Sequence, residues 1–417
     1  MKEAFQDAKK APVTALGGSV EVVTRAELAG CRHWAHAFSN ERKDHRYYEL
    51  VEDTIHQGFD YRYFVIKDAT GEVCAIQPFF LLEQDLLAGI AGPVTAAADF
   101  VRRWWPGFMQ MRTLMVGCTA GEGHLDRIDE MSHRRDAELL ADTIKKHAHD
   151  LKARLIVMKE FPATYRTSME CFVNDGFTRV PSLPMVDLNI DYADFDDYMM
   201  RGLPRRMRND LRRKFRDAAH AAPIELSVVT DATPIIDDIY PLYLQVYEKS
   251  SLHFEKLTKE YFCRIGRLMP DKARFFVWRQ SGKIIGFSLV LVQGDAIYSE
   301  YLGLDYSVAL RVHLYFYAFR DTVAWAIANG YKRYLSTGLN YDPKRNLRFQ
   351  LYPLDLYVRH TSRIFNVVLA RLLPLIEPTR YDKTLPRFAN YHELWDNGPP
   401  PQSIDVIPSR MEEKEVA

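Results

Sequence analysis

Three neighbouring segments decide the fold of this chain: ARFFVW at Ala273–Trp278, KIIGFSLVLV at Lys283–Val292 and AIYSEYL at Ala296–Leu302. β-Branched and aromatic residues dominate each segment, and short turns with Gly282 and Gly294 separate them. Hydrophobic runs of this kind, split by glycine-containing turns, are typical of an antiparallel meander. The sequence therefore predicts three consecutive antiparallel strands.

The residues that follow complete one structural unit. After an irregular link, a helix is predicted over about 313–329, because Gly330 stands where a C-cap glycine belongs. Tyr331–Leu335 is predicted as a short strand, and Ser336–Phe349 as a polar loop with the cationic residue Lys344. The predicted order is three strands, a link, a helix, a strand and a basic loop.

This order resembles the core of GNAT acyltransferases. More closely, it is similar to the double-GNAT group of FemAB-type transferases, BioF-like acetyltransferases and predicted N-acyltransferases. The resemblance is carried by Gly286, Gly303, Gly330 and Gly338, with Lys344 six residues after the last glycine. It implies an α+β fold of two tandem GNAT-like domains, each a mostly antiparallel twisted sheet flanked by helices.

An internal repeat supports two such domains. Tyr63–Ile66 and Gly71–Ala75 parallel Phe275–Trp278 and Gly282–Gly286. Two unrelated α+β domains that share hairpin chemistry would give the same likeness. The first copy is predicted to close with a hairpin over 175–188. The predicted division is a flexible leader (1–18), an N-terminal GNAT-like domain (19–195), a basic connecting helix (196–222), a C-terminal GNAT-like domain with the active site (223–362), a C-terminal helix and packing segment (363–396) and a disordered tail (397–417).

Composition excludes several classes of protein. The 417 residues include 55 Lys and Arg and 55 Asp and Glu, so no global charge attracts nucleic acid or anionic membranes. The five cysteines are scattered without a Cys-x-x-Cys motif, and no metal site is predicted. Glycines, Pro93 and Asp99 interrupt the longest apolar run, Leu86–Val101, which predicts no membrane span. We expect a cytoplasmic protein.

A glycine-rich loop with Gly117, Gly121 and Gly123 follows a predicted strand, Met111–Val116. Such a loop could hold phosphate through backbone N–H groups. Its own acidic residues, Glu122 among them, favour a structural turn instead.

The connector carries the highest local charge. From Arg201 to Arg216 there are eight cationic residues and one acid, Asp210. Leucine, methionine and phenylalanine recur every fourth residue along Leu203–Phe215, which predicts one apolar helix face. Three interpretations stay open: a solvated face balanced by acids elsewhere, a nucleic-acid contact, or a cleft lining in which arginines hold a phosphate or carboxylate. The arginines of the last interpretation are Arg205, Arg208 and Arg212.

Acyl transfer to an amine requires a base, donors for the developing oxyanion and anchors for the acyl carrier. The resemblance places exposed backbone N–H groups where Tyr298–Gly303 and Tyr331–Gly338 separate. Glu300, expected on one strand face with Tyr298 and Leu302, is the best candidate base; the alternative interpretation is an ordinary carboxylate, exposed on the strand face or paired with the basic loop. His313 is a second candidate, against a capping or packing role. The predicted binding residues in this half are Tyr298, Gly303, Gly338, Lys344 and Arg348.

The predicted function is N-acyltransfer, acetyl or longer, from acyl-CoA to the amine of a small molecule. The chain departs from simpler GNAT enzymes because GLDYSV at 303–308 lacks their Gln/Arg-x-x-Gly-x-Gly/Ala signature. The alternatives are therefore an aminoacyl-tRNA-dependent transferase of FemAB type and a non-catalytic ligand-binding protein. No bound cofactor is expected; acyl-CoA or another acyl carrier is a co-substrate, and no stable nucleic-acid partner is expected outside the tRNA-dependent alternative. The apolar helix Arg363–Leu373 is expected to pack on its own domain, with a homodimer contact or a membrane-surface patch as alternatives.

Overall fold

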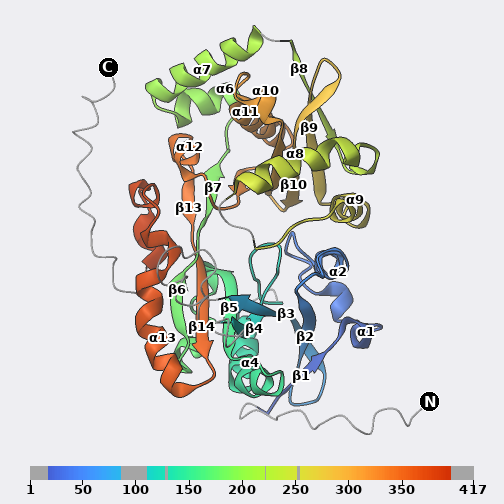
Figure 1. The fold of residues 1–417 in the computed structure, drawn as a ribbon, viewed down its shortest axis with the longest axis vertical. Coiled ribbons are helices and arrows are strands. Elements are labelled where there is room, and N and C mark those ends of the chain that lie inside the picture. The colour runs from blue at the N-terminus through green and yellow to red at the C-terminus, as the bar shows by residue number, and fades with distance from the viewer. Residues whose placement is uncertain (1–16, 86–109, 127–129, 221, 251–253, 396–417) are drawn as a thin grey trace, which may run out of the picture. The chain divides into compact units, whose positions relative to one another are not determined.

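A computed structural model describes residues 17–85, 110–126, 130–220, 222–250 and 254–395 (Figure 1). The predicted tail, nearly all of the predicted leader and the apolar run Leu86–Val101 lie outside this part. Contacts divide the chain into two compact units, each built from both halves of the sequence. The first unit comprises Met1–Val180, Leu252–Met269 and Asp355–Pro374, and the second comprises Pro181–Ser251, Pro270–Leu354 and Leu375–Ala417.

The first unit contains a seven-stranded sheet with flanking helices. Its strands are β1 (Ser19–Val23), β2 (Asp60–Lys67), β3 (Val73–Asp85), β4 (Gln110–Val116), β5 (Leu155–Pro162), β6 (Thr178–Pro181) and β14 (Leu354–His360). Its helices are α1 (Arg25–Leu28), η1 (Trp34–His36), α2 (His45–Thr54), α4 (Glu130–Asp150), η2 (Ala163–Tyr165), α5 (Glu170–Asn174), α9 (Lys259–Leu268) and most of α13 (Arg363–Ile376).

The second unit also contains a seven-stranded sheet. Its strands are β7 (Met185–Asn189), β8 (Ile224–Val229), β9 (Ala273–Gln280), β10 (Lys283–Gln293), β11 (Ala296–Leu304), β12 (Arg333–Ser336) and β13 (Gln350–Tyr352). Its helices are α6 (Phe195–Asp197), the π-helical turn η3 (Tyr198–Gly202), α7 (Arg205–Ala219), η4 (Thr233–Ile235), α8 (Ile236–Lys249), α10 (Tyr306–Ala309), α11 (Leu314–Ala328), α12 (Tyr341–Asn346), η5 (Pro378–Arg380), η6 (Leu385–Arg387) and η7 (Tyr391–Trp395).

The two sheets share one topology. The strand order is β1-β2-β3-β4-β5-β14-β6 in the first sheet and β8-β9-β10-β11-β12-β7-β13, read from its other end, in the second. In both, the first four strands pair antiparallel and the fourth pairs parallel with the fifth. The predicted tandem α+β repeat is thus confirmed at the level of strand order.

The sixth strand of each sheet comes from the other half of the chain. β14, from the C-terminal half, lies between β5 and β6, whereas β7 pairs antiparallel with β12 and β13. The hairpin predicted over 175–188 is therefore wrong, because β6 and β7 belong to different sheets. The compact units also place 252–269 and 355–362 with the first unit, although the predicted boundaries put both in the C-terminal domain.

The meander β9–β11 forms as the sequence indicates. Ser281 and Gly282 adopt positive φ at the first turn and Gly294 does so at the second, a conformation that glycine adopts without steric cost. Most residues of β9 and nearly all residues of β10 are buried. Phe276 and Trp278 pack with α11 residues in one apolar cluster, so α11 covers this face of the sheet.

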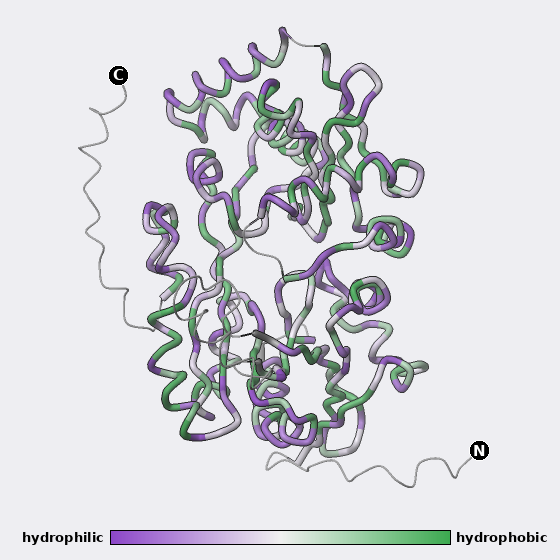
Figure 2. The backbone as a smooth tube through the Cα atoms, in the orientation of Figure 1, coloured by the Kyte–Doolittle hydropathy of each residue, from purple (hydrophilic) through white to green (hydrophobic). Residues whose placement is uncertain are grey.

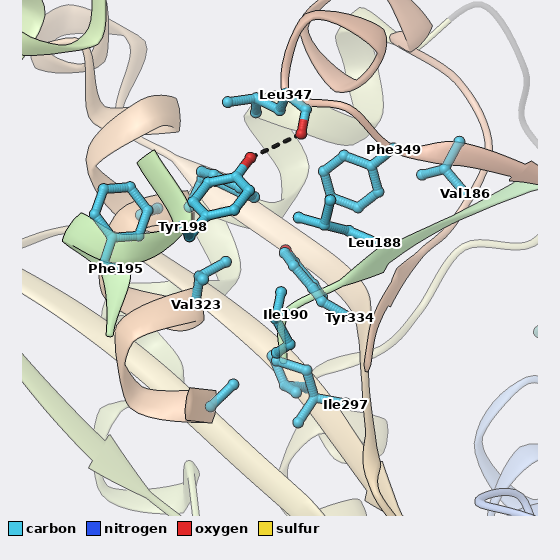
Figure 3. Packing of buried hydrophobic residues seen from close by; sticks show 14 of the residues in the cluster. Val186, Leu188, Ile190, Phe195, Tyr198, Ile297, Val323, Tyr334, Leu347 and Phe349 are labelled. Atoms are coloured by element: carbon cyan, nitrogen blue, oxygen red, sulfur yellow. Dashed lines mark hydrogen bonds between the residues drawn. The ribbon is translucent and has the colours of Figure 1, made fainter. Parts of the chain in front are cut away.

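Aromatic side chains fill the core of the second unit. Phe195, Tyr198, Tyr334 and Phe349 pack together in the cluster of Figure 3. The hydroxyl of Tyr198 donates a hydrogen bond of 2.7 Å to the carbonyl oxygen of Leu347. This bond satisfies the polar end of a fully buried ring and ties η3 to the end of α12.

Several predicted bounds change. The polar loop expected over 336–349 contains α12, and the helix expected over about 313–329 is α11 at Leu314–Ala328. On α13, Leu369 and Leu373 pack against the first sheet, whereas large apolar residues elsewhere on the helix are exposed, such as Ile364 at 77 % and Phe365 at 62 %. Among the described residues, no helix combines the length and apolarity that crossing a bilayer requires.

Candidate active site

The candidate site forms where β11 and β12 diverge. Their parallel ladder runs from the pair Ala296–Arg333 to the pair Ser299–Ser336 and ends there. The two strands therefore separate within Tyr298–Gly303 and Tyr331–Gly338, the segments in which the separation is predicted. Beyond it, β11 continues to Leu304, whereas β12 turns into the loop before α12.

A β-bulge places Glu300 at this divergence. Tyr301 pairs with Leu289 and Ser299 pairs with Val290, so Glu300 is the extra residue on β11. Bulges interrupt the alternation of side chains and redirect them locally. The bulge interrupts the regular alternation on which the expected shared face of Tyr298, Glu300 and Leu302 depends, although Glu300 and Leu302 both line the cavity described next.

A cavity of about 680 Å³ opens at the divergence, and its lining lies wholly within the second unit. Four consecutive β11 residues, 299–302, contribute to the lining, which strict alternation would not allow. The apolar part comes from buried rings, and hydroxyl groups and a few charged residues make up the rest. The lining includes the rings of Trp278, Phe319, Tyr334 and Phe349 and the charged residues Glu300 and Lys344.

Glu300 is 7 % exposed and lies against this cavity. Hydroxyl groups surround the same part of the lining: Ser288 Oγ lies 3.4 Å from Ser299 Oγ. Burial raises the pKa of the neighbouring Tyr334 to about 12, so its phenol stays protonated at neutral pH. Glu300 is thus the buried carboxylate of this cavity, whereas Asp382 at its edge is half-buried.

Lys344 brings a cation to the same cavity. Its Nζ donates hydrogen bonds to the carbonyl oxygens of Thr337, at 2.6 Å, and Leu339, at 3.0 Å. Leu339 and Asn340 have left-handed φ values of 71° and 49°, so the lysine holds a tightly bent loop. Burial lowers the pKa of Lys344 to about 7, which leaves the amine partly neutral near physiological pH.

The other predicted residues of this half are spread around the second unit. Gly338 lines the cavity. Tyr298 packs beside a separate small cluster that contains Leu335. Gly303 is a packing glycine, because a Cβ there would collide with the Phe287 ring and lie 2.8 Å from the Tyr243 backbone nitrogen. A binding role for Tyr298 and Gly303 stays a prediction.

His313 and Arg348 lie outside the described lining of this cavity. His313 adopts the left-handed conformation before α11, and its Nε2 lies 3.8 Å from Asp217 Oδ2. Arg348 is exposed and has φ of 67°. The structure thus places Glu300 and Lys344 at one cavity, and His313 and Arg348 are not part of its described lining.

The predicted arginines lie on α7, which Figure 2 colours hydrophilic along much of its length. Arg205 and Arg212 are exposed. Arg208 donates hydrogen bonds to the carbonyl oxygens of Met200 and Leu203, at 2.9 and 3.0 Å, and therefore supports the turn before the helix. Their role toward an anionic ligand stays a prediction.

Sequence reasoning missed two cavity residues that lie outside the meander and its loop. Lys249 ends α8, and its Nζ lies 3.4 Å from the centre of the Tyr306 ring, which also lines the cavity. A cation this close to an aromatic face is favourable. Neither residue belongs to a local motif, so only the tertiary arrangement reveals the pair.

The equivalent divergence in the first unit is occupied by its own side chains. The β4–β5 ladder ends at the pair Val116–Met158, and the glycine-rich loop follows β4. Glu122 of that loop is 4 % exposed and forms ion pairs with Arg42 and with Lys43, whose Nζ lies at 3.2 Å. Burial opposes ionisation of Glu122, but these two cations outweigh it and hold the pKa of Glu122 well below its usual range.

Lys159 also fills this region. Its Nζ donates a 2.9 Å hydrogen bond to the Gly121 carbonyl oxygen and lies 2.6 Å from Glu160 Oε2. Gly121 has φ of 129°, and a Cβ there would collide with the Lys43 amine. The glycines of this loop therefore allow lysine side chains to pack against the backbone, which agrees with the structural interpretation.

Comparison with known proteins identifies the class of the second unit. Residues 205–345 match the family model described as an acetyltransferase (GNAT) domain. This part of the chain therefore matches a GNAT acetyltransferase domain, as the sequence pattern predicted.

Individual relatives are distant. The chain is 23 % identical over 358 residues to a Mycobacterium tuberculosis protein named putative 8-amino-7-oxononanoate synthase 2, a match covering 82 % of this chain and 46 % of the relative. The chain thus spans about half the length of that curated relative. Among solved structures, FemX gives a TM-score of 0.51 at 13 % identity, covering 85 % of this chain and 100 % of FemX. A tandem GNAT protein from the clavulanic acid pathway gives 0.43 at 11 % identity, covering 82 % and 99 %.

Proposed function

We propose that the cavity of the second unit transfers an acyl group, acetyl or longer, from acyl-CoA to the amine of a small molecule. The observation that carries this proposal is the meeting of Glu300 and Lys344 at one cavity, where two parallel strands diverge inside a GNAT acyltransferase domain. A base and a cation are two of the requirements of acyl transfer from a thioester.

In this reaction the neutral amine nitrogen attacks the thioester carbonyl carbon. A C–N bond forms, the C–S bond breaks, and the sulfur leaves as thiolate. Glu300 accepts the proton that the amine loses, directly or through water, and that proton then passes to the thiolate. An amine that enters as ammonium first loses one further proton to solvent.

The oxyanion that develops on the carbonyl needs donors of fixed geometry. Backbone N–H groups beside the bulge at Glu300 would supply them, because the ladder to β12 ends one residue earlier. Lys249, at the end of α8, provides a cation on the cavity lining for an anionic part of the acyl carrier. No resident cofactor enters any of these steps.

An aminoacyl-tRNA donor is the second candidate. The observation that favours it is the charge of α7: within the described residues, the exposed Arg205, Arg206 and Arg216 form no ion pair. Unpaired arginines along a helix suit a phosphate backbone. Loss of activity after RNase treatment would support this donor, and full activity with purified acyl-CoA would exclude it as a requirement.

The test is a screen of the purified chain against a panel of acyl-CoA thioesters with pooled amines, reading release of free thiol. We expect amine-dependent release, and Glu300→Gln should lower it about a hundredfold with the fold intact. Saturable binding of acyl-CoA without any amine-dependent release would instead identify a ligand-binding protein. Absence of both binding and release would refute the proposal.

A further inference from the structure

Lys344 is a buried cation in a cavity large enough for a substrate. Its side chain is 7 % exposed, and two backbone carbonyls take two of the three N–H donors of the ammonium. Within the described part of the chain, no carboxylate forms an ion pair with it. A buried charge of this kind is normally paired.

Among the described residues, the protein thus supplies no negatively charged partner for Lys344. Burial lowers the pKa of Lys344, and within the described ranges of the chain no acid raises it again. A bound anion would reverse this shift, because an opposite charge at hydrogen-bond distance favours the ammonium form. Binding of an anion at Lys344 would therefore be accompanied by uptake of a proton.

The same cavity contains a buried carboxylate, Glu300, on β11, whereas Lys344 comes from α12. Half-buried Asp382 and exposed Lys249 also line the cavity, so Glu300 and Lys344 are the buried acid and the buried base of this lining. A molecule with an amine and a carboxylate would contact both at once. Buried rings, including Trp278, Phe319 and Phe349, supply the apolar part of the lining.

We propose that the acceptor is an amino acid with an apolar side chain, bound with its carboxylate at Lys344 and its amine toward Glu300. This inference rests on the proposed function and names the substrate class of the same site. The aromatic lining receives the side chain of the amino acid. Lys344 is then a binding and specificity residue, which distinguishes amino acids from simple amines.

The anion at Lys344 could instead be a phosphate of the acyl carrier, since both groups offer oxygens to an ammonium. The two sources predict different kinetics. A carboxylate contact makes Lys344 discriminate between acceptors, whereas a phosphate contact makes it control the KM of the thioester and leaves acceptor preference unchanged.

The kinetic test compares leucine and phenylalanine with their amides as acceptors at pH 7. Rates are referred to the concentration of neutral amine, because the amides are less basic. We expect the wild-type chain to prefer each acid at least tenfold in kcat/KM. Lys344→Met should reduce the preference below twofold through the KM of the acid, and Lys344→Arg should retain most of it.

Lys332→Met is the matched control, because Lys332 is half-exposed on the same unit and pairs with Asp191 at 2.6 Å. It should keep the full preference. Equal rates for acid and amide in the wild-type chain would overturn the inference, as would a Lys344→Met variant that changes only the KM of the thioester. If no amine supports thiol release, the proposed function itself fails.

A second measurement needs neither a variant nor activity. Calorimetric titration of the wild-type chain with leucine or phenylalanine, in buffers of different ionisation enthalpy at pH 7.5, reports protons taken up on binding. With a free pKa of about 7 for Lys344, we expect uptake of about three quarters of a proton per bound acid. Binding of the acids without uptake would refute the contact.

Discussion

The two sheets diverge at equivalent places, but only the second unit forms a large cavity there among the residues that the structure describes. After Ser299 and Ser336, β11 and β12 open onto about 680 Å³. After Val116 and Met158, the first unit has a cavity of about 10 Å³ beside Gly117, enough for about one water molecule. The same strand order thus has an open divergence in the second unit and a filled divergence in the first unit.

The difference arises from a few side chains. In the first unit, Arg42, Lys43 and Lys159 surround the glycine-rich loop and pair with its backbone and with Glu122. In the second unit, hydroxyl groups, Glu300 and Lys344 line the open cavity. We therefore expect charge to stabilise the first unit, whereas we propose that charge in the second unit serves a ligand.

The largest expected effect is on the stability of the first unit. Glu122→Gln keeps the shape of the side chain but leaves Arg42 and Lys43 buried without their counter-charge. Breaking a buried ion pair on one side costs about 3–5 kcal/mol. We expect a loss of this size in the free energy of unfolding at pH 7, measured by denaturant titration.

The loss should depend on pH. The folded state holds the pKa of Glu122 below its ordinary value of 4.5, so its contribution is present above that value and disappears as pH falls toward the folded pKa. The difference between wild type and Glu122→Gln should therefore shrink below pH 4.5. Asp150→Asn, which removes an exposed pair with Lys146, should change stability by less than about 0.5 kcal/mol. A pH-independent difference would contradict the assignment.

Glu300→Gln should give the converse result. Loss of the base lowers kcat by about a hundredfold, within the range of general base catalysis, with a small change in stability. Steady-state thiol release and thermal unfolding measured on one preparation separate the two effects. Comparable activity of Glu300→Gln and wild type would remove the functional half of the comparison.

Gly303→Ala should have an intermediate effect. A Cβ at this position meets the Phe287 ring and the Tyr243 backbone, so the site must shift, which typically costs about 1–3 kcal/mol. Gly330→Ala is the control, because it has open space and φ of 82°, and it should cost about 1 kcal/mol. A neutral Gly303→Ala would show that α8 does not pack closely on β11.

The smallest effect is expected on α7. Arg205 is exposed and forms no ion pair among the described residues, so Arg205→Ala should change stability by less than about 0.5 kcal/mol. If the predicted arginine face holds an anionic part of the donor, the KM for acyl-CoA should rise about threefold with kcat unchanged, since one exposed charge contact is weak. An unchanged KM would leave α7 as a solvated face.

Local patterns predicted the meander β9–β11, the helix before Gly330 and the basic helix α7, because hydrophobic period and glycine turns act over short distances. Local patterns did not predict which sheet β7 and β14 join. A short strand carries no local record of which sheet it joins, and β7 pairs with residues 144 (333 minus 189) to 167 (352 minus 185) positions away in the sequence.

The candidate site could likewise be predicted only in part from the sequence. Glu300 and Lys344 were identifiable from the motif order, but the bulge that turns Glu300 toward the cavity depends on its register with β10. Lys249 and Tyr306 come together only through tertiary packing. The sequence also predicts His313 and Arg348 in the site, but both lie outside the described lining of the cavity, and both have left-handed φ values.

Hydrogen–deuterium exchange with and without a non-hydrolysable acyl-CoA analogue tests the central claim most directly. The open divergence should gain protection in peptides that cover 299–302 and 336–344, whereas peptides over 117–124 in the filled divergence should not change. Protection at 117–124 with none at 299–302 would contradict the assignment of the acyl-transfer site to the second unit.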